Sequence, residues 1–383
     1  MRYSSIIRVG LLGAVVAGAA GGTRAQDVPR TYPPAAPLTP DTAANNASLG
    51  DKQRFANPSV LGMGPSKGLV VRYERMPTFG VSSSAQVVGI QNYAGEISKN
   101  ARLSIKGYIP AWNHPHLKVI VGLSYEREEF QFKKMPTNYE LFDNIENKGL
   151  KSTAAQIAVI RPVDNVHWYL VRVKGELAGD YTSRELTRAD YSRFSAEAIY
   201  GWKRSPNFSW GVGFQYGYTF GRLSLYPAVI FNRTFNAHWG VEALAPARLT
   251  LRYNANSNSI FYAGYTVDGY NYIVHLRTPL ARKNPDGSSD INTTPLRTLE
   301  LRETEVKFRL RWEHEVFSFL WMGAEAGYRY NYAFDAFDRT NADRLKIIDS
   351  KFNGAPYASL ELFITPPRKL LEKAGVSCDI AHG

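Results

Sequence analysis

The chain has 383 residues, enough for one large domain or two ordinary ones, so its length leaves the architecture open. Aromatic residues make up 13% of it, with 23 Tyr, 19 Phe and 7 Trp, yet its mean hydropathy is only −0.30. No long segment carries this apolar content, so polar and apolar side chains must alternate at short range, as they do along β-strands. The only cysteine, Cys378, excludes an intramolecular disulfide, and we treat a functional thiol there as a minor alternative.

The formal net charge is +12 and falls to +9 without the first 25 residues, which contain three Arg and no acid. Basic residues alternate with apolar ones instead of forming blocks, which argues against nucleic acid as a partner. Glycine motifs that bind phosphate are absent, because Gly211-Val212-Gly213 continues as a strand without a helix to accept a phosphate.

Residues 1–25 have the layout of a secretory signal peptide. Arg2 and Arg8 form a basic region, small apolar residues fill 11–20, and cleavage after residue 25 leaves Gln26 as the first mature residue. A short membrane anchor is the alternative, but its apolar run is too short to span a bilayer. No later run of 18 or more apolar residues follows, so only a closed barrel could cross a membrane.

Residues 26–66 are rich in Pro, Ala, Asn and Ser, which predicts extended or disordered structure. We interpret this segment as a periplasmic linker, with a segment that folds back to plug a barrel as the alternative. At the other end, residues 366–383 begin with Pro366-Pro367 and form a predicted periplasmic tail beyond the barrel, which we assign to residues 67–365.

From residue 68 onward the hydropathy pattern has a period of two. In residues 117–126 one face carries Leu, Val and Tyr, and the other carries Lys, Gly, Ser and Glu. The pattern recurs near 169–180 and 305–312, and in 211–220 the apolar face is aromatic except for Val212, with Tyr218 and Phe220 at its end. Each segment therefore predicts a strand with one apolar and one polar face, about ten residues long, as in a transmembrane barrel.

Short turns alternate with longer polar stretches at about 130–151, 181–191, 278–298 and 331–352. This asymmetry is typical of an outer-membrane barrel, whose short turns face the periplasm. Tryptophans flank the short turns, so we predict that they form an aromatic girdle on the periplasmic side. The predicted girdle consists of Trp112, Trp168, Trp202, Trp210, Trp239 and Trp312.

The chain therefore predicts an all-β fold, a transmembrane antiparallel up-and-down barrel with fourteen strands and both ends on the periplasmic side. The first strand and an Asp268-Gly269 hairpin are the weakest assignments, and dropping a pair of strands leaves twelve. The predicted strands span 68–76, 98–110, 117–130, 152–162, 167–180, 192–203, 208–219, 222–233, 238–253, 258–267, 270–278, 299–312, 316–330 and 354–364. Pro227 and Pro246 fall inside strands, where we expect bulges or strand ends.

The block from residue 211 to 272 is similar to an uncharacterised family of bacterial outer-membrane barrels, known mostly from Bacteroidota. The resemblance implies an outer-membrane barrel without an assigned activity, so no catalytic or binding residue is carried over. It rests on Tyr226-Pro227, residues 235–242, Ala245-Pro246, Leu251-Arg252-Tyr253, Gly264-Tyr265 and Tyr270-Asn271-Tyr272.

The polar faces of the predicted strands carry sixteen charged side chains that we expect to face the lumen. They either pair across neighbouring strands and fill the interior, or line a water-filled pore whose excess of Arg and Lys favours anions. These candidates are Arg102, Lys106, Lys118, Glu126, Arg172, Lys174, Glu176, Glu197, Arg248, Arg252, Glu305, Lys307, Arg309, Arg311, Glu325 and Arg329. A barrel of twelve to fourteen strands is intermediate between eight-stranded barrels, which side chains fill, and sixteen-stranded porins, which are open. Strand number therefore does not decide whether the interior is filled or forms a pore.

Catalytic and metal-binding motifs are not evident. His114 and His116 flank a predicted turn without a third ligand, so we expect turn histidines rather than a metal site. A His-x-Ser arrangement typical of outer-membrane phospholipases is absent, although a Ser-His-Asp site assembled from distant strands stays open. We therefore predict no cofactor and no metal.

Three hypotheses follow from the sequence. The first is a non-enzymatic outer-membrane barrel, either a passive channel for small polar or anionic solutes or a structural barrel; its expected partners are outer-membrane lipid and, during biogenesis, the barrel-assembly machinery. The second is a membrane-embedded hydrolase acting on lipid or peptide. The third is a secreted soluble β-sandwich, in which the apolar faces would be buried between two sheets.

Overall fold

The computed structural model describes residues 56–366, apart from residues 89, 115, 134, 136–138, 183, 186–188, 284–287, 289–293 and 340–344. The predicted signal peptide, most of the 26–66 segment, Cys378 and the tail beyond residue 366 lie outside the described residues. Within the described part, no helix is long and apolar enough to cross a membrane. It contains a nine-residue helix, α2 (Glu140–Lys148), and a single 3-10 turn at Ala189–Tyr191.

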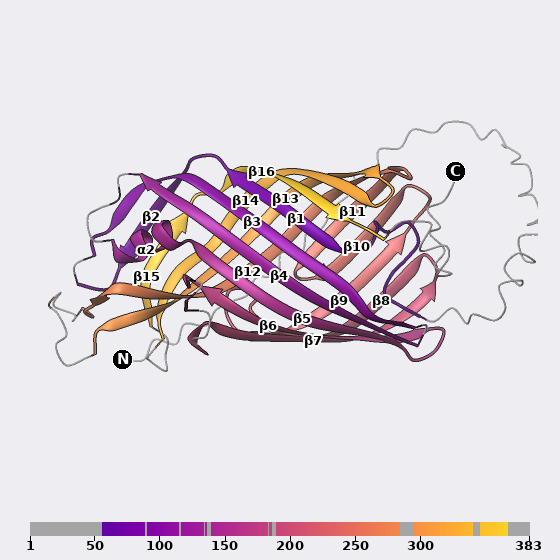
Figure 1. The fold of residues 1–383 in the computed structure, drawn as a ribbon, viewed down its shortest axis with the longest axis horizontal. Helices are drawn as coiled ribbons and strands as arrows, with labels where there is room; N and C mark the ends of the chain where they lie inside the picture. The colour runs from indigo at the N-terminus through magenta and orange to yellow at the C-terminus, as the bar shows by residue number, and fades with distance from the viewer. Residues whose placement is uncertain are drawn as a thin grey trace, which may run out of the picture. The chain divides into compact units, whose positions relative to one another are not determined.

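Strands form nearly all of the regular structure and follow one another in antiparallel hairpins (Figure 1). In the described residues they are β1 (Leu69–Met76), β2 (Phe79–Ala85), β3 (Tyr93–His114), β4 (Leu117–Lys133), β5 (Leu150–Pro162), β6 (His167–Gly179), β7 (Ser192–Ser205), β8 (Phe208–Gly217), β9 (Ser224–Thr234), β10 (Trp239–Ala245), β11 (Arg248–Asn256), β12 (Ser259–Leu280), β13 (Leu296–Phe317), β14 (Leu320–Asp338), β15 (Lys346–Phe352) and β16 (Ala355–Ile364).

The sheet closes into a ring, because β1 pairs with β3 on one side and with β16 on the other, and β16 pairs with β14. β2 continues β1 in the same register, since Met76 pairs with Asn100 and Phe79 with Ile97. Pro77 separates the two segments because proline has no N–H to donate to the ladder. β15 and β16 likewise form one interrupted strand, so the sixteen described segments make fourteen strands, which confirms the predicted number.

Two predicted strand boundaries were wrong, and their errors cancel in the count. The predicted strand 238–253 is two strands, β10 and β11, which a tight turn at Pro246 and Ala247 separates. The predicted hairpin at Asp268-Gly269 lies inside the single strand β12, whose register with β13 runs unbroken through both residues. Glycine is needed at 269 because a Cβ there would collide with the backbone carbonyl of Tyr218 in the β8–β9 link, not because the chain turns.

The two ends of the barrel differ in their links. At the turn end, six hairpins are joined by four residues or fewer, and the first and last strand residues, Leu69 and Ile364, pair with each other there. At the opposite end, here called the loop end, α2, β2 and β15 lie together (left in Figure 1). This asymmetry matches the predicted alternation of short turns and long loops.

The wall is taller on one side than on the other. β12 has 22 residues, whereas the adjacent strand β11 has 9 and the next strand, β10, has 7. Beyond the end of β11, the free edge of β12 meets the end of β6, where Ile273 pairs with Gly179 in parallel and accepts a hydrogen bond from the Asp180 N–H (3.0 Å). Towards the loop end the ring therefore bypasses β7 to β11 and becomes narrower.

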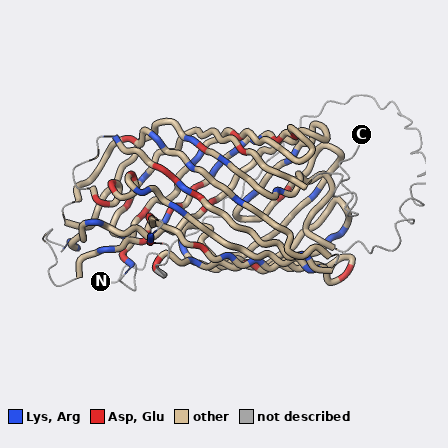
Figure 2. Tube along the Cα trace, viewed as in Figure 1, with Lys and Arg blue, Asp and Glu red and all other residues tan. Residues whose placement is uncertain are grey.

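Apolar side chains face outward from the ring. Along β16, exposed and buried residues alternate without exception, and Leu360, Leu362 and Ile364 point out of the barrel. Other strands contribute exposed residues such as Ile109, Leu123, Phe214, Leu225, Phe308 and Leu310. An apolar exterior on a closed sheet is typical of a transmembrane barrel, whereas the soluble sandwich would bury these side chains, so that hypothesis is wrong. Figure 2 shows acidic and basic positions interleaved along the same strands.

The predicted tryptophan girdle needs one correction. Trp112 and Trp239 are exposed, with 55% and 42% of their surfaces accessible, and Trp202 stacks on Trp210 with ring centroids 4.5 Å apart. Trp312 is half-buried on the outward side of β13. Trp168, however, is fully buried inside the barrel, where its indole N–H donates to Ser209 Oγ (3.1 Å).

Trp168 lies beside a turn, which favours a place in the girdle, but the alternation of β6 determines the direction of its side chain. It shares the side of that strand with Arg172, a predicted lumen residue, and therefore points inward.

Ring closure predicts a disulfide between the first and last strands. Val71 and Leu362 are directly paired and both face outward, so cysteines at these positions should form a cross-link on mild oxidation in a Cys378→Ser background. The measurement is faster migration of the fully denatured, unreduced chain on a gel. Cysteines at Val71 and Leu310, which three strand steps separate, serve as the control pair. Equal cross-linking of both pairs would contradict the closed ring.

Candidate functional site

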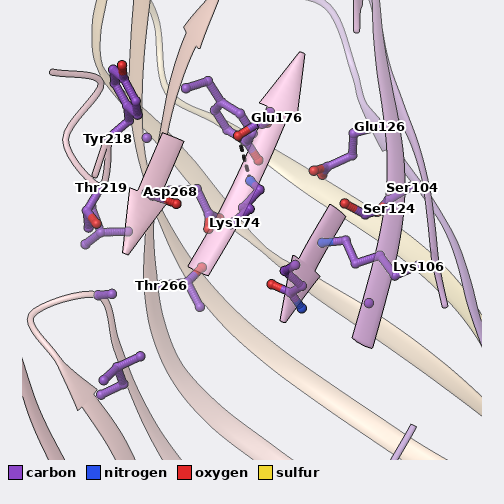
Figure 3. A pocket seen from close by; sticks show the side chains of 18 of the residues that line it. Ser104, Lys106, Ser124, Glu126, Lys174, Glu176, Tyr218, Thr219, Thr266 and Asp268 are labelled. Carbon is purple, nitrogen blue, oxygen red and sulfur yellow. Dashed lines mark ion pairs between the residues drawn. The ribbon is translucent and has the colours of Figure 1, made fainter. Parts of the chain in front are cut away.

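A cavity of about 490 Å³ lies inside the barrel, and polar side chains from β1, β3 to β8 and β12 to β14 line it (Figure 3). Ten of the sixteen side chains predicted to face the lumen line this cavity. They are Arg102, Lys106, Glu126, Arg172, Lys174, Glu176, Glu197, Lys307, Arg309 and Glu325.

An ion-pair network forms one wall of the cavity. It consists of described side chains that join into one connected set, seven basic and seven acidic, so its formal charge is zero. Three further predicted residues, Glu305, Arg311 and Arg329, belong to it. The members are Lys67, Arg72, Glu74, Arg102, Glu128, Glu303, Glu305, Lys307, Arg309, Arg311, Glu313, Glu325, Arg329 and Glu361.

Arg329 on β14 is the most densely paired side chain of this network. Its guanidinium lies 2.5 Å from Glu305, 2.9 Å from Glu128 and 3.0 Å from Glu303, and only 2% of the side chain is exposed. Charges buried this deeply require paired hydrogen-bonding partners, because each one loses its hydration. The network therefore fixes the relative positions of β4, β13 and β14 as well as filling space.

The sequence-based selection omitted half of this network. The omitted members are Lys67, Arg72, Glu74, Glu128, Glu303, Glu313 and Glu361, and five of them are acidic. The alternation in the sequence indicates three of these residues. Glu303 and Glu313 lie on the same face of their strand as residues 305, 307, 309 and 311. Glu128 likewise lies on the same face as residues 124 and 126. Arg72, Glu74 and Asp268 line the cavity in addition to the ten predicted residues. Seven basic and six acidic side chains therefore line it, so an anion preference no longer follows from excess positive charge.

Two cavity residues were missed because of errors in local structure. Asp268 was assigned to a hairpin, but it lies within β12 and lines the cavity. Tyr218 was assigned to the outer face of a strand, but β8 ends at Gly217, and the following link folds against β12. Asn271 donates a hydrogen bond to the Gly221 carbonyl (3.0 Å) and holds this link in place, so Tyr218 and Thr219 reach the cavity.

Residues 56–66 lie along the inner side of the wall at the turn end. The Ala56 N–H donates to the Asp164 carbonyl (3.2 Å), Asn232 donates to the Pro58 carbonyl (2.8 Å), and Arg252 donates to the Gly62 carbonyl. Arg252 is fully buried and also pairs with Glu242, so this predicted lumen residue binds the chain itself. The remaining two predicted residues, Lys118 and Arg248, do not line the cavity.

The turn that receives Ala56 is stabilised by Asp164, which lies outside the strands. Its carboxylate accepts hydrogen bonds from the His167 and Val166 N–H groups, both at 2.6 Å, and pairs with the His167 ring (2.7 Å). These interactions lower the pKa of Asp164 to about 2, and the hydrogen bond from the His167 N–H has the largest effect. The carboxylate is therefore charged at any physiological pH and keeps the turn in one conformation.

An apolar cluster fills the loop end of the barrel. Helix α2 contributes Leu141, Phe142 and Ile145, all fully buried, and packs them against aromatic residues of the surrounding strands. Phe142 stacks on Phe132 of β4 with ring centroids 4.5 Å apart. The described members of this cluster carry no charge, and Tyr270, which packs against them, also lines the polar cavity.

The described residues contain no group of three or more His, Cys, Asp or Glu side chains placed to hold a metal ion. Ser259 Oγ lies 2.7 Å from His314 Nδ1, but no ion pair joins that ring to a carboxylate within the part of the chain that the structure describes. A triad needs such a third group to orient the histidine.

Comparisons with known proteins give only distant similarities. Neither a family model nor a curated protein matches the chain. Among solved structures, an outer membrane channel from Pseudomonas putida F1 is 6% identical and has a TM-score of 0.36, with 81% of this chain and 99% of that chain covered. A Pseudomonas aeruginosa FadL homologue is 9% identical (TM-score 0.35; 78% and 89% covered), and the NanC porin is 10% identical (TM-score 0.32; 78% and 100%). The barrel assignment rests on the strand pairing of the chain itself.

Removal of the central arginine of the network should destabilise the barrel. In Arg329→Met, the carboxylates of Glu128, Glu303 and Glu305 lose a buried partner, so we expect the free energy of unfolding to fall by about 3–5 kcal/mol. Urea unfolding in detergent micelles, followed by tryptophan fluorescence, measures the change. Lys118→Met is the matched control, because Lys118 makes no ion pair among the described residues. A loss no larger than that of the control would show that the network does not stabilise the barrel.

Proposed function

We propose that this protein is a passive channel of a bacterial outer membrane, which admits small polar solutes to a charged internal cavity. The observation that carries the proposal is the hollow itself, a polar space of about 490 Å³ enclosed by a wall whose outer side is apolar. A barrel with only a structural role can fill its interior completely with side chains, as small barrels do. A retained polar cavity favours passage or binding of a solute.

In this proposal the turn end faces the periplasm and the loop end faces outward, the usual orientation of short turns and long loops in outer-membrane barrels. The predicted signal peptide exports the chain, the barrel-assembly machinery inserts it, and outer-membrane lipid surrounds it. Residues 56–66 then act as a plug at the periplasmic mouth, with the preceding residues as its periplasmic tether. We also propose membership of the uncharacterised Bacteroidota-type family that residues 211–272 resemble.

The apolar cluster at the loop end acts as the outer gate. Water and solutes avoid a dry apolar constriction, so passage requires its displacement. Helix α2 is the element that must move, because it carries the apolar side chains of one side of this cluster. Its polar contacts with β12 would have to break, including an ion pair between Asp143 and Arg277 (3.1 Å). Glu140 accepts a hydrogen bond from the Thr278 N–H (3.0 Å), and Asn144 donates to the His275 carbonyl.

A structural barrel is the second candidate, since the apolar cluster and residues 56–66 occupy opposite ends of the barrel. The two candidates differ in whether a solute ever crosses. An open path through the protein is required for the first and absent in the second.

Permeability of proteoliposomes tests the channel. We expect vesicles that contain the protein to swell in isosmotic arabinose faster than empty vesicles. The variant Leu141→Ala, Phe142→Ala, Ile145→Ala should swell several-fold faster than the unaltered protein, because it removes the apolar side of α2. The matched control is Leu360→Ala, Leu362→Ala, which removes apolar side chains from the outer face of β16. If neither the protein nor its triple-alanine variant admits arabinose, the structural barrel is the correct function.

A further inference from the structure

We propose that the cavity is a binding site for zwitterionic solutes, small molecules that carry both an ammonium and a carboxylate group, such as amino acids and short peptides. The proposal rests on the proposed channel function and names the class of solute. Lys106, Glu126 and Asp268 are the residues that would recognise it.

These three residues differ from every other charged side chain that lines the cavity. The cavity wall carries thirteen charged side chains, and ten of them are engaged in ion pairs with one another or with the network. Arg172 pairs with Glu197 and Lys174 with Glu176, each at 2.7 Å, and the remaining six belong to the network. Of the charged side chains that line the cavity in the described part of the chain, Lys106, Glu126 and Asp268 alone form no direct hydrogen bond or ion pair.

Lys106 and Glu126 lie on neighbouring strands, and their opposite charges attract each other, but no direct ion pair joins them. Lys106 pairs across the ladder with Ser124, and Ser104 pairs with Glu126, so the two charges are diagonal neighbours. Diagonal positions on one face of a sheet are about 7–8 Å apart, which leaves room for a solute group between their ends. Figure 3 shows both side chains and the two serines projecting from the same part of the wall, and Asp268 projecting from a separate strand.

A charge that faces an enclosed cavity without a partner is only partly compensated by water, so it favours a solute of opposite charge. The free charges here are one ammonium and two carboxylates. A purely anionic solute would satisfy Lys106 and be repelled by Glu126 and Asp268, whereas a purely cationic solute would be repelled by Lys106. A zwitterion satisfies both signs at once, with its carboxylate at Lys106 and its ammonium between the two acids.

The rest of the lining suits such a solute. The paired arginines and lysines cannot turn towards it without breaking short ion pairs, so the free trio determines selectivity. Uncharged hydrogen-bonding groups complete the wall and can hold the amide or hydroxyl groups of a small solute. They include Ser104, Ser124, Gln156, Gln215, Thr219 and Thr266. A volume of about 490 Å³ lies within the usual range for pockets that enclose small molecules.

The test compares swelling of proteoliposomes in glycylglycine, a zwitterion, with swelling in arabinose, an uncharged solute. It uses the triple-alanine variant of α2 as the background, so that the outer gate does not limit the rate. We expect glycylglycine to enter faster than arabinose. Lys106→Met, Glu126→Gln and Asp268→Asn should each reduce the ratio of the glycylglycine rate to the arabinose rate several-fold.

Lys118→Met is the matched control, because it removes a lysine from the inward side of β4 outside the cavity, and it should not alter the ratio. Lys106→Arg retains the positive charge and should retain most of the preference, which separates a charge effect from misfolding. Equal ratios in the background protein and all three variants would overturn the zwitterion site while arabinose entry still supports the channel. A ratio that falls only in Lys106→Met would also overturn it, in favour of an anion site.

Discussion

Everything inside this barrel depends on the neutralisation of buried charge. The outer faces of the strands are apolar, so the alternation of each strand places its charged residues inward, where they have little water. Seven basic and seven acidic side chains meet this requirement by pairing with one another. Most of the charged side chains around the cavity are paired as well, and Lys106, Glu126 and Asp268 are the charged lining residues of the described chain that have no direct ion pair. The unmatched charges therefore all face the hollow.

The same network joins parts of the chain that are far apart in sequence. Arg72 on β1 binds Glu325 on β14, Arg102 on β3 binds Glu305 on β13, and Lys67 binds Glu361 on β16. These pairs surround the seam between the first and last strands. Arg72 and Arg102 also pair with Glu74 and Glu128 of the N-terminal strands, but their remaining acidic partners belong to β13 and β14. Complete pairing of these buried charges therefore requires closure of the ring.

The alternation of hydropathy predicted most of the fold, because in a barrel one rule fixes both the strands and the direction of each side chain. It failed where a local signal was given more weight, as for Trp168 beside its turn and Asp268 beside a glycine. It could not predict the apolar cluster, since Phe130 and Phe132 face inward with the same period as residues that face lipid. Nor could spacing along one strand indicate which charges pair, because partners such as Glu303 and Arg329 lie on different strands.

The unequal heights of the wall have a consequence for the surrounding lipid. A tilted strand needs about 9–11 residues to cross the hydrocarbon layer, and β12 exceeds this length whereas β10, with seven residues, falls short of it. Acyl chains beside β10 must shorten or tilt to match the low side, at a cost of fractions of a kcal/mol per Å of mismatch. In an otherwise uniform bilayer, the membrane is therefore locally thinner beside β10. The rotation of the barrel about the membrane normal determines which neighbouring lipids and proteins lie in this thinner region.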